Sequence, residues 1–440
     1  MKLELRLDPG TKLLGRAILG GAPLRVLRLS EAGARLVREW RDGALVAESP
    51  QHRKLADRLI DAGMAHPVYG EAHLTRADVT VVVPARDPET LPEADVVVDD
   101  GSRVPISGAA QRHPVARGPA AARNTGLAHV TTELTAFLDA DTTAPPDWLD
   151  PLLPHFEDPA VVAVAPRIRS TPGSSVLARY ETARSSLDLG DGPAPVRQGG
   201  RVTYVPTAVL VVRTAALREL GGFDERLRFG EDVDLVWRLV ARGGRVRYEP
   251  AAEVLHVPRK TWRAWARQRF DYGTSAAPLA RRHGHQAIAP LRISGWTALA
   301  WGLVAARRPA LGVAVALGTA ALLPRKLRPL GVPARESLTI ALRGHLRAGR
   351  YLADVLTRTW GPVAVPLLLA TRRGRALLAL ALARHLAEWR EARPDLDPAR
   401  WLLARTADDL CYGAGVWRSC LRERNFLPLV PDFSNWPGKK

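Results

Sequence analysis

Short apolar runs alternating with helix-like segments dominate the middle of the chain. From Val79 onward the runs "VTVVVPARD", "ADVVVDDGS", "ELTAFLDAD" and "AVVAVAPRI" are rich in valine and alanine, and polar turn residues bound each of them. Segments between them, such as "GPAAARNTGLAHV", have the composition of helices. Continuous apolar strands that alternate with helices predict an α/β fold, with a largely parallel sheet covered by helices on both faces.

The first 75 residues predict a different order of elements. "APLRVLRLS" is typical of a strand and leads into Ser30, which is a suitable N-cap for the helix "EAGARLVREW". "SPQHRKLADRLIDAG" predicts a second amphipathic helix, with Leu55 and Leu59 on one face and Gly63 as its C-cap. A strand and two helices in so short a segment predict a small winged-helix-like module over residues 1–75. "HPVYGEAHLTRAD" predicts a linker after it.

After about residue 290 the sequence becomes rich in alanine, leucine and arginine, which predicts a helical C-terminal region. Arginines interrupt its apolar runs, and each run is shorter than the roughly 20 residues that a membrane-spanning helix needs, so we expect no transmembrane segment. Two explanations stay open: helices that lie on an anionic membrane surface, or a cytosolic helical domain with an arginine-rich solvent face. The runs cover residues 296–306, 310–323, 363–370 and 376–383.

Composition and charge narrow the class of protein. With 46% hydrophobic and 25% charged residues the 440-residue chain has a globular composition. Its net charge of +18 is uneven: residues 257–440 hold 31 basic and 11 acidic residues, whereas residues 76–256 hold 20 and 25. An acidic middle argues against a nucleic-acid enzyme. The two cysteines fit neither a disulfide framework nor a four-ligand zinc site, which indicates a reducing compartment. The first residues lack the apolar stretch of a secretory signal, so we expect a cytosolic protein.

Acidic residues follow several of the predicted strands. Asp99 and Asp100 precede Gly101, and by themselves they indicate no more than a turn. Asp139 and Asp141 lie two residues apart at the end of a strand, so their side chains can point to the same side. Two carboxylates completed by substrate phosphates are a usual Mg²⁺ arrangement, although an isolated "DAD" is a weak signal.

The order of the motifs is more specific than any one of them. "VPARD", "VDDGS", "ARNTG", "FLDADT", "GGFDERLRFGEDVDLVWRL" and "VLHVPRKTW" follow one another over residues 79–270. This series resembles the inverting family 2 glycosyltransferases, which have a GT-A fold: a Rossmann-like, mostly parallel sheet. The "QxxRW" pattern of processive synthases is absent and "ARQRFDYG" stands in its place, which argues against a polysaccharide synthase with its own channel.

The resemblance implies a role for each motif. The acceptor hydroxyl would lose its proton to Asp232, with Glu231 beside it, and we expect both acids to stay ionised because they open a helix. A histidine after the last strand often completes the metal site, although a packed or solvated histidine is the alternative for His256. Mg²⁺ or Mn²⁺ would be held by Asp139, Asp141 and His256. The nucleotide sugar would contact Pro84, Arg86, Asp100, Arg123, Asp139 and Asp141, with Asp100 and Arg123 holding the uracil.

Nearly the full length is similar to one subfamily. "GGAPLRVLRLS" and "LIDAGMAHP" near the start and "DLCYGAGVWRSCL" near the end resemble the glycosyltransferases of the mycofactocin system, in which the N-terminal module is similar to PqqD-type peptide-recognition domains. This resemblance implies transfer of glucose from UDP-glucose, in β-linkage, to the peptide-derived redox cofactor mycofactocin or its precursor. It implies a UDP-sugar donor and a peptide-derived acceptor with its leader peptide or carrier as partners, and no nucleic acid. We expect the enzyme in the cytoplasm, with its C-terminal helices at the inner face of the membrane.

Other interpretations of the sequence remain. In one of them the N-terminal module is a winged helix that binds DNA, although its net charge of +3 is low for that role. In another the module only packs against the catalytic domain. Three alternatives concern the whole chain. It would be a nucleotidyltransferase, a glycosyltransferase that acts on a cell-envelope glycan or lipid, or a peptide- or DNA-binding adaptor with an inactive transferase core. The expected domains are residues 1–75, 76–290 and 291–440.

Overall fold

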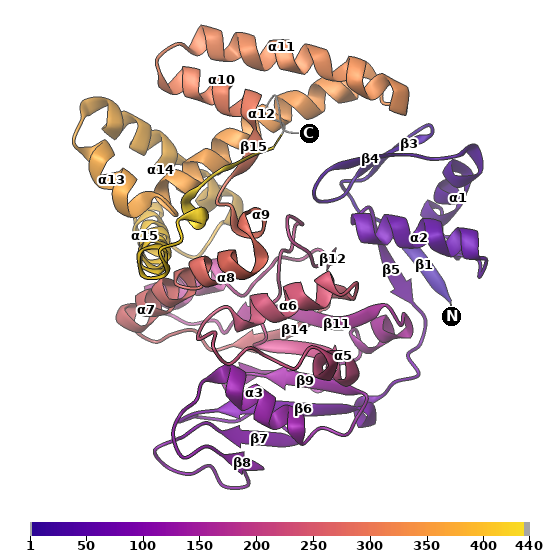
Figure 1. Ribbon diagram of the computed structural model, residues 1–440, viewed down its shortest axis with the longest axis vertical. Coiled ribbons are helices and arrows are strands. Elements are labelled where there is room, and N and C mark those ends of the chain that lie inside the picture. The colour runs from indigo at the N-terminus through magenta and orange to yellow at the C-terminus, as the bar shows by residue number, and fades with distance from the viewer. Residues whose placement is uncertain (1, 435–440) are drawn as a thin grey trace. The chain divides into compact units, whose positions relative to one another are not determined.

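The computed structural model (Figure 1) describes residues 2–434. The chain divides into two compact units. Unit 1 comprises Met1–Leu13, Ile18–Ser174 and Arg184–Pro258. Unit 2 comprises Leu14–Ala17, Ser175–Ala183 and Arg259–Lys440. The N-terminal segment therefore falls largely in the same unit as the central α/β sequence, and the three-part division made from the sequence stays a prediction.

The N-terminal segment forms small sheets and two helices around its own core. As expected, Ser30 caps the first helix by accepting from the Gly33 amide at 3.0 Å, and Gly63 ends the second with a left-handed φ of 67°. The buried side chains include Trp40 and Leu59. The elements are β1 (Leu3–Leu7), β2 (Lys12–Leu14), β3 (Ala17–Gly20), β4 (Arg25–Arg28), α1 (Glu31–Arg41), α2 (Pro50–Ala62) and β5 (Ala65–Tyr69).

The expected linker begins as a strand instead. Ala65–Tyr69 form β5, which pairs antiparallel with β1 in the register Leu5↔Pro67. Strands β2, β3 and β4 form a separate three-stranded sheet with β4 at one end. The sequence pattern did not predict β5 because its partner lies about 60 residues earlier, and a strand with a proline at its centre has little local signal.

The central sequence folds into one nine-stranded sheet, and this confirms the α/β prediction. Its order is β10-β14-β11-β13-β9-β6-β7-β8, with β12 added to β14. The pairings make β8, β7, β6, β9, β11 and β14 run in one direction, while β13, β10 and β12 run in the other. The sheet is thus mixed but mostly parallel, with the Rossmann-like character of a GT-A fold. The strands are β6 (Val79–Ala85), β7 (Val96–Asp99), β8 (Gln111–Arg112), β9 (Leu134–Leu138), β10 (Thr142–Thr143), β11 (Val161–Ser170), β12 (Ala194–Pro195), β13 (Val209–Arg213) and β14 (Arg245–His256).

Helices pack on this sheet and set the position of its motifs. Helix α3 (Pro119–Ala128) lies on β6 and β7, and α6 (Glu231–Ala241) lies on β14. Gly126 permits the close approach of α3, because a Cβ at this position would come within 2.3 Å of a Val82 methyl carbon. The remaining elements of unit 1 are η1 (Arg76–Asp78), η2 (Leu153–Glu157) and α5 (Thr214–Glu219).

Unit 2 is largely helical. Helix α11 is long enough and apolar enough to cross a membrane over Pro309–Leu330, with a mean hydropathy of 1.4, whereas we expected no such segment. The apolar run stops at Leu323, but the helix continues through Pro324 and the basic residues behind it. The elements are α4 (Val176–Arg184), α7 (Trp262–Gly273), α8 (Ala276–His283), α9 (His285–Ile288), β15 (Arg292–Ser294), α10 (Gly295–Ala305), α11 (Pro309–Leu327), η3 (Arg328–Leu330), α12 (Ala334–Thr357), α13 (Gly361–Leu369), α14 (Arg372–Ala392), α15 (Pro398–Glu423), η4 (Leu427–Leu429) and β16 (Asp432–Ser434).

Candidate functional site

The candidate site lies at the edge of the sheet where β6, β7 and β9 end. These neighbouring strands are parallel, so the residues that follow them reach the same edge. Asp99 closes β7, and Asp139 follows β9 directly. The predicted motifs "VPARD", "VDDGS" and "FLDADT" are thereby brought together within unit 1.

The Asp139–Asp141 turn is held by hydrogen bonds on both sides. The Asp139 amide donates to the Ala208 carbonyl at 2.8 Å, and the Thr142 hydroxyl donates to the Asp139 carbonyl at 2.7 Å. Strand β10 then pairs with β14 in the register Thr142↔His256. This pairing carries the end of "VLHVPR" to the acidic turn, although more than 100 residues separate the two in sequence.

His256 lies next to Asp141. Its Nε2 is 3.3 Å from Asp141 Oδ1, and the imidazole is buried. Asp139 has a different neighbour, because the Arg123 guanidinium donates to its Oδ1 at 2.7 Å. The predicted metal ligands are therefore divided between two contacts, one from Arg123 to Asp139 and one between His256 and Asp141. Among residues 2–434 the structure has no preformed group of three His, Cys, Asp or Glu side chains with the arrangement of a metal site.

The chemistry of this donor set nevertheless fits a divalent cation. Two carboxylates and one imidazole are ligands that Mg²⁺ or Mn²⁺ accept, and a bound diphosphate supplies further oxygens. In the structure two cationic or hydrogen-bonding side chains, Arg123 and His256, lie against these carboxylates. The residue types and their place at one edge of the sheet therefore suit a divalent cation. The metal role of Asp139, Asp141 and His256 stays a prediction.

Arg123 connects the acidic turn to the start of α6. From its buried position on α3 it donates to Asp139 Oδ1 and, at 3.0 Å, to Glu231 Oε1. Its guanidinium carbon lies 5.5 Å from the centre of the Phe223 ring. One guanidinium thus serves carboxylates from both the "DAD" and "GED" motifs. The sequence interpretation gave Arg123 a contact with uracil, and this contact stays a prediction.

Glu231 and Asp232 open α6, as expected from "GEDVDL", but their electrostatic environment differs from the expectation. Asp232 is half-buried and accepts from the Val233 amide at 2.7 Å. Burial, with the neighbouring Glu231 charge, raises the pKa of Asp232 to about 7. Burial also raises the pKa of Glu231. The helix N-terminus was expected to keep both acids ionised, but desolvation outweighs the modest effect of the helix dipole.

Asp100 organises the loop that leads into α3. Its carboxylate accepts from the Arg117 and Gly118 amides, both at 2.8 Å, and lies 2.7 Å from His113 Nδ1. Gly101 permits the tight turn, since its φ is 73° and a Cβ would come within 2.5 Å of the Ala116 nitrogen. Three contacts occupy most of the acceptor capacity of Asp100. Its predicted contact with uracil stays a prediction.

The two remaining predicted contacts lie at the end of β6. Pro84 is half-buried within the strand, and Arg86 is exposed just beyond it. The next residue joins this loop to the turn after β7: the Asp87 amide donates to the Ser102 hydroxyl at 2.9 Å, and Asp87 Oδ1 accepts from the Arg103 amide at 2.9 Å. Pro84 and Arg86 therefore lie close in the sheet to the Asp100 turn, as the motif order required.

Sequence reasoning missed two residues of this region. Asn124, next to Arg123, accepts from the Phe223 amide at 2.8 Å and donates to the Phe223 carbonyl at 2.9 Å, so it holds the "GGFDE" loop against α3. His113 Nε2 lies 3.0 Å from the Thr125 hydroxyl and connects the Asp100 loop to the same helix. The asparagine of "ARN" was visible as a signal, whereas His113 belongs to no recognisable motif.

The arginine that stands where "QxxRW" would be found has a structural position in unit 2. In "ARQRFDYG" on α7, Arg269 is buried and forms ion pairs with Glu181 and Asp408. Trp265 of the same helix donates to Glu181 at 2.8 Å. This segment therefore helps to build the buried core of unit 2.

Comparison with known proteins shows what the chain is similar to. The model of a family described as "Glycosyltransferase like family 2" matches residues 58–271. The pre-mycofactocin glycosyltransferase of Mycobacterium tuberculosis is 41% identical, over 95% of this chain and 94% of that protein. The poly-beta-1,6-N-acetyl-D-glucosamine synthase of Staphylococcus aureus is 30% identical over 31% of this chain and 33% of that protein. A mannosyltransferase from Pyrobaculum calidifontis, solved with GDP-Man and Mn²⁺, aligns with a TM-score of 0.42 and 16% identity, over 80% of this chain and 90% of that one.

Proposed function

The chain belongs to the pre-mycofactocin glycosyltransferases of glycosyltransferase family 2, and from this membership we propose that it transfers glucose from UDP-glucose, with inversion to a β-linkage, onto the mycofactocin precursor. The enzyme is a glycosyltransferase; the donor, the linkage and the acceptor are the proposal. The observation that carries the proposal is the connected set of carboxylates in which Arg123 links Asp139 to Glu231, with Asp232 beside it.

On the donor side, Asp139, Asp141 and His256 would hold Mg²⁺ or Mn²⁺ at the diphosphate of the nucleotide sugar. The cation would neutralise the charge that develops on the departing UDP. The protein itself positions the acidic turn at the edge of the sheet, because β10 pairs with β14 and the Ala208 carbonyl accepts from the Asp139 amide. Pro84, Arg86 and Asp100 would border the nucleotide at the ends of β6 and β7.

On the acceptor side, Asp232 would act as the general base. The acceptor hydroxyl oxygen attacks the anomeric carbon of glucose, its proton passes to the Asp232 carboxylate, and the bond from that carbon to the UDP oxygen breaks on the opposite face. Attack opposite the leaving group inverts the configuration at the anomeric carbon. A pKa of about 7 supports this role, since such a group accepts and releases a proton near neutral pH.

Glu231 and Arg123 would position the two halves of the site. Glu231 is held by Arg123, and the same guanidinium holds Asp139, so the base and the acidic turn share one support. Contacts from Asn124 to the Phe223 backbone fix the loop ahead of Glu231. This arrangement connects the acceptor base to the donor site through one set of side-chain contacts, which would help to position the two for a direct displacement.

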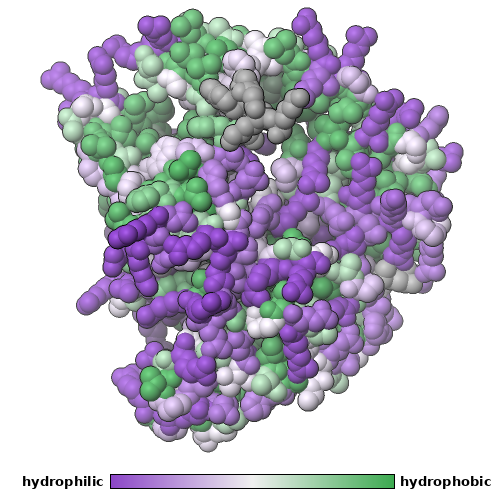
Figure 2. All heavy atoms as spheres, in the orientation of Figure 1, coloured by the Kyte–Doolittle hydropathy of each residue, from purple (hydrophilic) through white to green (hydrophobic). Residues whose placement is uncertain are grey.

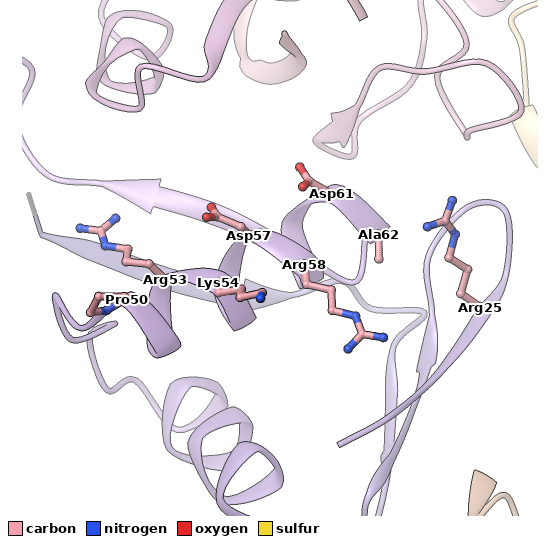
Figure 3. A pocket seen from close by; sticks show the side chains of 8 residues that line it. All are labelled: Arg25, Pro50, Arg53, Lys54, Asp57, Arg58, Asp61 and Ala62. Atoms are coloured by element: carbon pink, nitrogen blue, oxygen red, sulfur yellow. The ribbon is translucent and has the colours of Figure 1, made fainter. Parts of the chain in front are cut away.

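A pocket in the N-terminal segment supports a peptide acceptor (Figure 3). It has a volume of about 520 Å³, with Arg25 on β4 and its other lining residues on α2. Its two carboxylates, Asp57 and Asp61, are already paired with Arg245 at 2.9 and 2.8 Å. The lining residues are Arg25, Pro50, Arg53, Lys54, Asp57, Arg58, Asp61 and Ala62.

The charge and the strands around this pocket suit an acidic peptide segment. Four basic residues line it, so a ligand carrying carboxylates is favoured. Strand β4 ends the β2-β3-β4 sheet, and an end strand can add a peptide by backbone hydrogen bonds. We therefore propose that residues 1–75 hold the peptide-derived acceptor, its leader peptide or its carrier, and that residues 76–290 and 291–440 are the catalytic and helical domains of a cytoplasmic enzyme.

The test is a donor screen on the purified full-length protein with the mycofactocin precursor, Mn²⁺ or Mg²⁺ and a set of UDP-sugars. Mass spectrometry should detect addition of a hexose with UDP-glucose, together with release of UDP. Asp232→Asn is the matched control, expected to bind UDP but not to transfer. Release of pyrophosphate from a nucleoside triphosphate would instead identify a nucleotidyltransferase, and absence of transfer from every UDP-sugar would contradict the proposal.

A further inference from the structure

Helices α10, α11 and α12 of unit 2 form one packed layer, which we call the helix layer. His345 on α12 joins all three: its Nδ1 lies 3.1 Å from the Thr297 hydroxyl on α10, and its Nε2 lies 3.0 Å from the Thr319 hydroxyl on α11. The Trp301 indole of α10 donates to the His345 carbonyl at 2.8 Å. The three helices are thus held together by specific contacts.

The helix layer leaves much of its apolar surface exposed. Only 11% of the apolar window of α11 is buried, so α11 is unlike the core helix of a soluble domain. Figure 2 shows hydrophobic side chains gathered at the top of the view, the position of α10 and α11 in Figure 1. The exposed residues include Trp296 and Leu299 on α10, Leu311, Val313, Leu317 and Leu322 on α11, and Leu338, Leu342 and Leu346 on α12. A patch of this extent marks an interaction surface.

Basic residues stand at both ends of α11 and no acidic residue accompanies them. Residues 295–330 contain five basic side chains and no aspartate or glutamate. Arg307 and Arg308 precede α11, and Arg325, Lys326 and Arg328 lie in and just after its last turn. An apolar centre between cationic ends matches the order of acyl chains and phosphates at the surface of an anionic bilayer.

The neighbouring helices decide between crossing the bilayer and lying in its plane. Over its 22 residues α11 with η3 is about 33 Å long, which equals the hydrocarbon thickness. Helix α10 has 11 residues and is about half as long as needed. Helix α12 packs on α11 and carries Arg343, Arg347 and Arg350. If α11 crossed the bilayer, it would bring either the short helix α10 or the arginine-bearing helix α12 into the hydrocarbon core, which costs free energy.

We propose that the helix layer docks on an anionic lipid bilayer, with α11 lying in the membrane plane. The apolar side chains of α10 and α11 enter the boundary between headgroups and acyl chains, and the basic ends of α11 contact lipid phosphates. A second copy of the chain fits this surface less well, because it would bring the cationic ends of α11 together, and residues 295–330 have no acidic side chain to pair with them. The occupant is therefore a bilayer that carries phosphatidylglycerol or another acidic lipid.

The experiment is co-sedimentation of the full-length protein with vesicles. The protein should bind vesicles of phosphatidylcholine with about 30% phosphatidylglycerol at least about tenfold more tightly than vesicles of phosphatidylcholine alone. High salt should reduce this difference in affinity. Leu311→Glu with Leu317→Glu should remove binding. Leu403→Glu is the matched control, since Leu403 is 72% exposed on α15, outside the helix layer, and should bind as the wild type does.

Two further measurements make the result decisive. Tryptophan emission should shift to the blue with anionic vesicles, and Trp296→Phe should reduce that shift because Trp296 is 46% exposed on α10. If the double glutamate variant does not fold, Arg325→Gln with Arg328→Gln should still lower the preference for anionic vesicles. Failure of the wild type to bind them, or undiminished binding by the folded glutamate variant, would overturn the proposal. So would a lipid-free dimer that the glutamate variant dissociates, since it would assign the surface to a second copy.

Discussion

Two pairs of neighbouring acids, one in each unit, show opposite electrostatics. Glu231 and Asp232 open α6 in unit 1, and Asp408 and Asp409 lie within α15 in unit 2. Burial raises the pKa of Asp232 to about 7. The pKa of Asp409 is lowered instead, although burial opposes that shift, because its partners outweigh the desolvation. The same short sequence feature thus produces an acid that titrates near neutral pH in one place and an acid that stays ionised at neutral pH in the other.

The difference follows from the number of cations around each pair. Asp409 lies 3.3 Å from His385 Nε2, which makes the largest contribution to the lowering of its pKa, and it contacts two arginines, Arg358 at 3.0 Å and Arg405. It also accepts from the Thr357 hydroxyl at 3.1 Å. In unit 1 the single guanidinium of Arg123 is shared between Asp139 and Glu231. A buried acid with ample cationic partners stabilises the structure, whereas an acid left short of them keeps an affinity for protons that catalysis can use.

Asp232→Asn should have the largest effect on catalysis. Removing the general base is expected to lower kcat about 1,000-fold and to leave UDP affinity nearly unchanged, because the base contacts the acceptor. The Tm of the variant should instead be higher than that of the wild type near neutral pH. The raised folded-state pKa means that the wild type loses stability as pH rises from about 4 through about 7, and asparagine does not ionise. Kinetics, UDP titration and melting curves at pH 6 and pH 8 measure these effects; weaker UDP binding or a lower Tm at pH 8 would contradict them.

Asp409→Asn should reverse this pattern and affect stability most. Two arginines would lose a buried anionic partner, at a cost of about 3–5 kcal/mol in the free energy of unfolding. Because the folded-state pKa of Asp409 is lowered, its contribution is present above the ordinary aspartate pKa and is lost as the pH falls below it. Urea unfolding at pH 7 and at about pH 2.5, which lies below the ordinary aspartate pKa, should therefore show a smaller difference from the wild type in acid. Unchanged kcat per folded molecule is also expected, and loss of transfer without loss of stability would remove the contrast.

The pH dependence of transfer sharpens the comparison further. If Asp232 is the base, kcat should rise about tenfold per pH unit below pH 7 and level off above it, since the carboxylate must be ionised to accept the proton. Glu231 and Asp139 raise the pKa of Asp232 by their charges, and Arg123 lowers it. Initial rates from pH 5 to pH 9 at saturating substrate would test this expectation. A flat profile through pH 7 would assign the proton transfer to another group.

The motif order predicted the sheet edge well because the acids, glycines and apolar runs are local signals. Asp139, Asp141, Glu231 and Asp232 all lie where the sequence placed them, at the end of β9 and the start of α6. Their partners could not be predicted in the same way. The bridge through Arg123 depends on the relative position of α3, β9 and α6, and the raised pKa values depend on burial, which no spacing rule reports.

The same limit applies outside the site. Strand β5 depends on pairing with β1, and the full length of α11 depends on a helix that continues past the apolar run and through Pro324. Short-range pattern predicted the start of α1 and the end of α2 correctly, because the Ser30 cap and Gly63 act within one turn. Features fixed by neighbouring residues were therefore predictable, and features fixed by distant chain segments were not.

Arg123→Lys should give the smallest effect and tests why the site holds one arginine. Lysine keeps the positive charge but lacks the planar fork that reaches Asp139 and Glu231 together, so one of the two contacts should be lost. Weaker compensation leaves the acids at α6 with a greater affinity for protons, and the pH at half-maximal kcat should therefore rise by a fraction of a unit, with kcat lowered several-fold. The matched variant in unit 2 is Arg358→Lys, which should lower the Tm and leave the pH profile unchanged. If Arg123→Lys altered only stability, the guanidinium would have the same structural role as those around Asp409, and the electrostatic contrast between the two acid pairs would not be connected with catalysis.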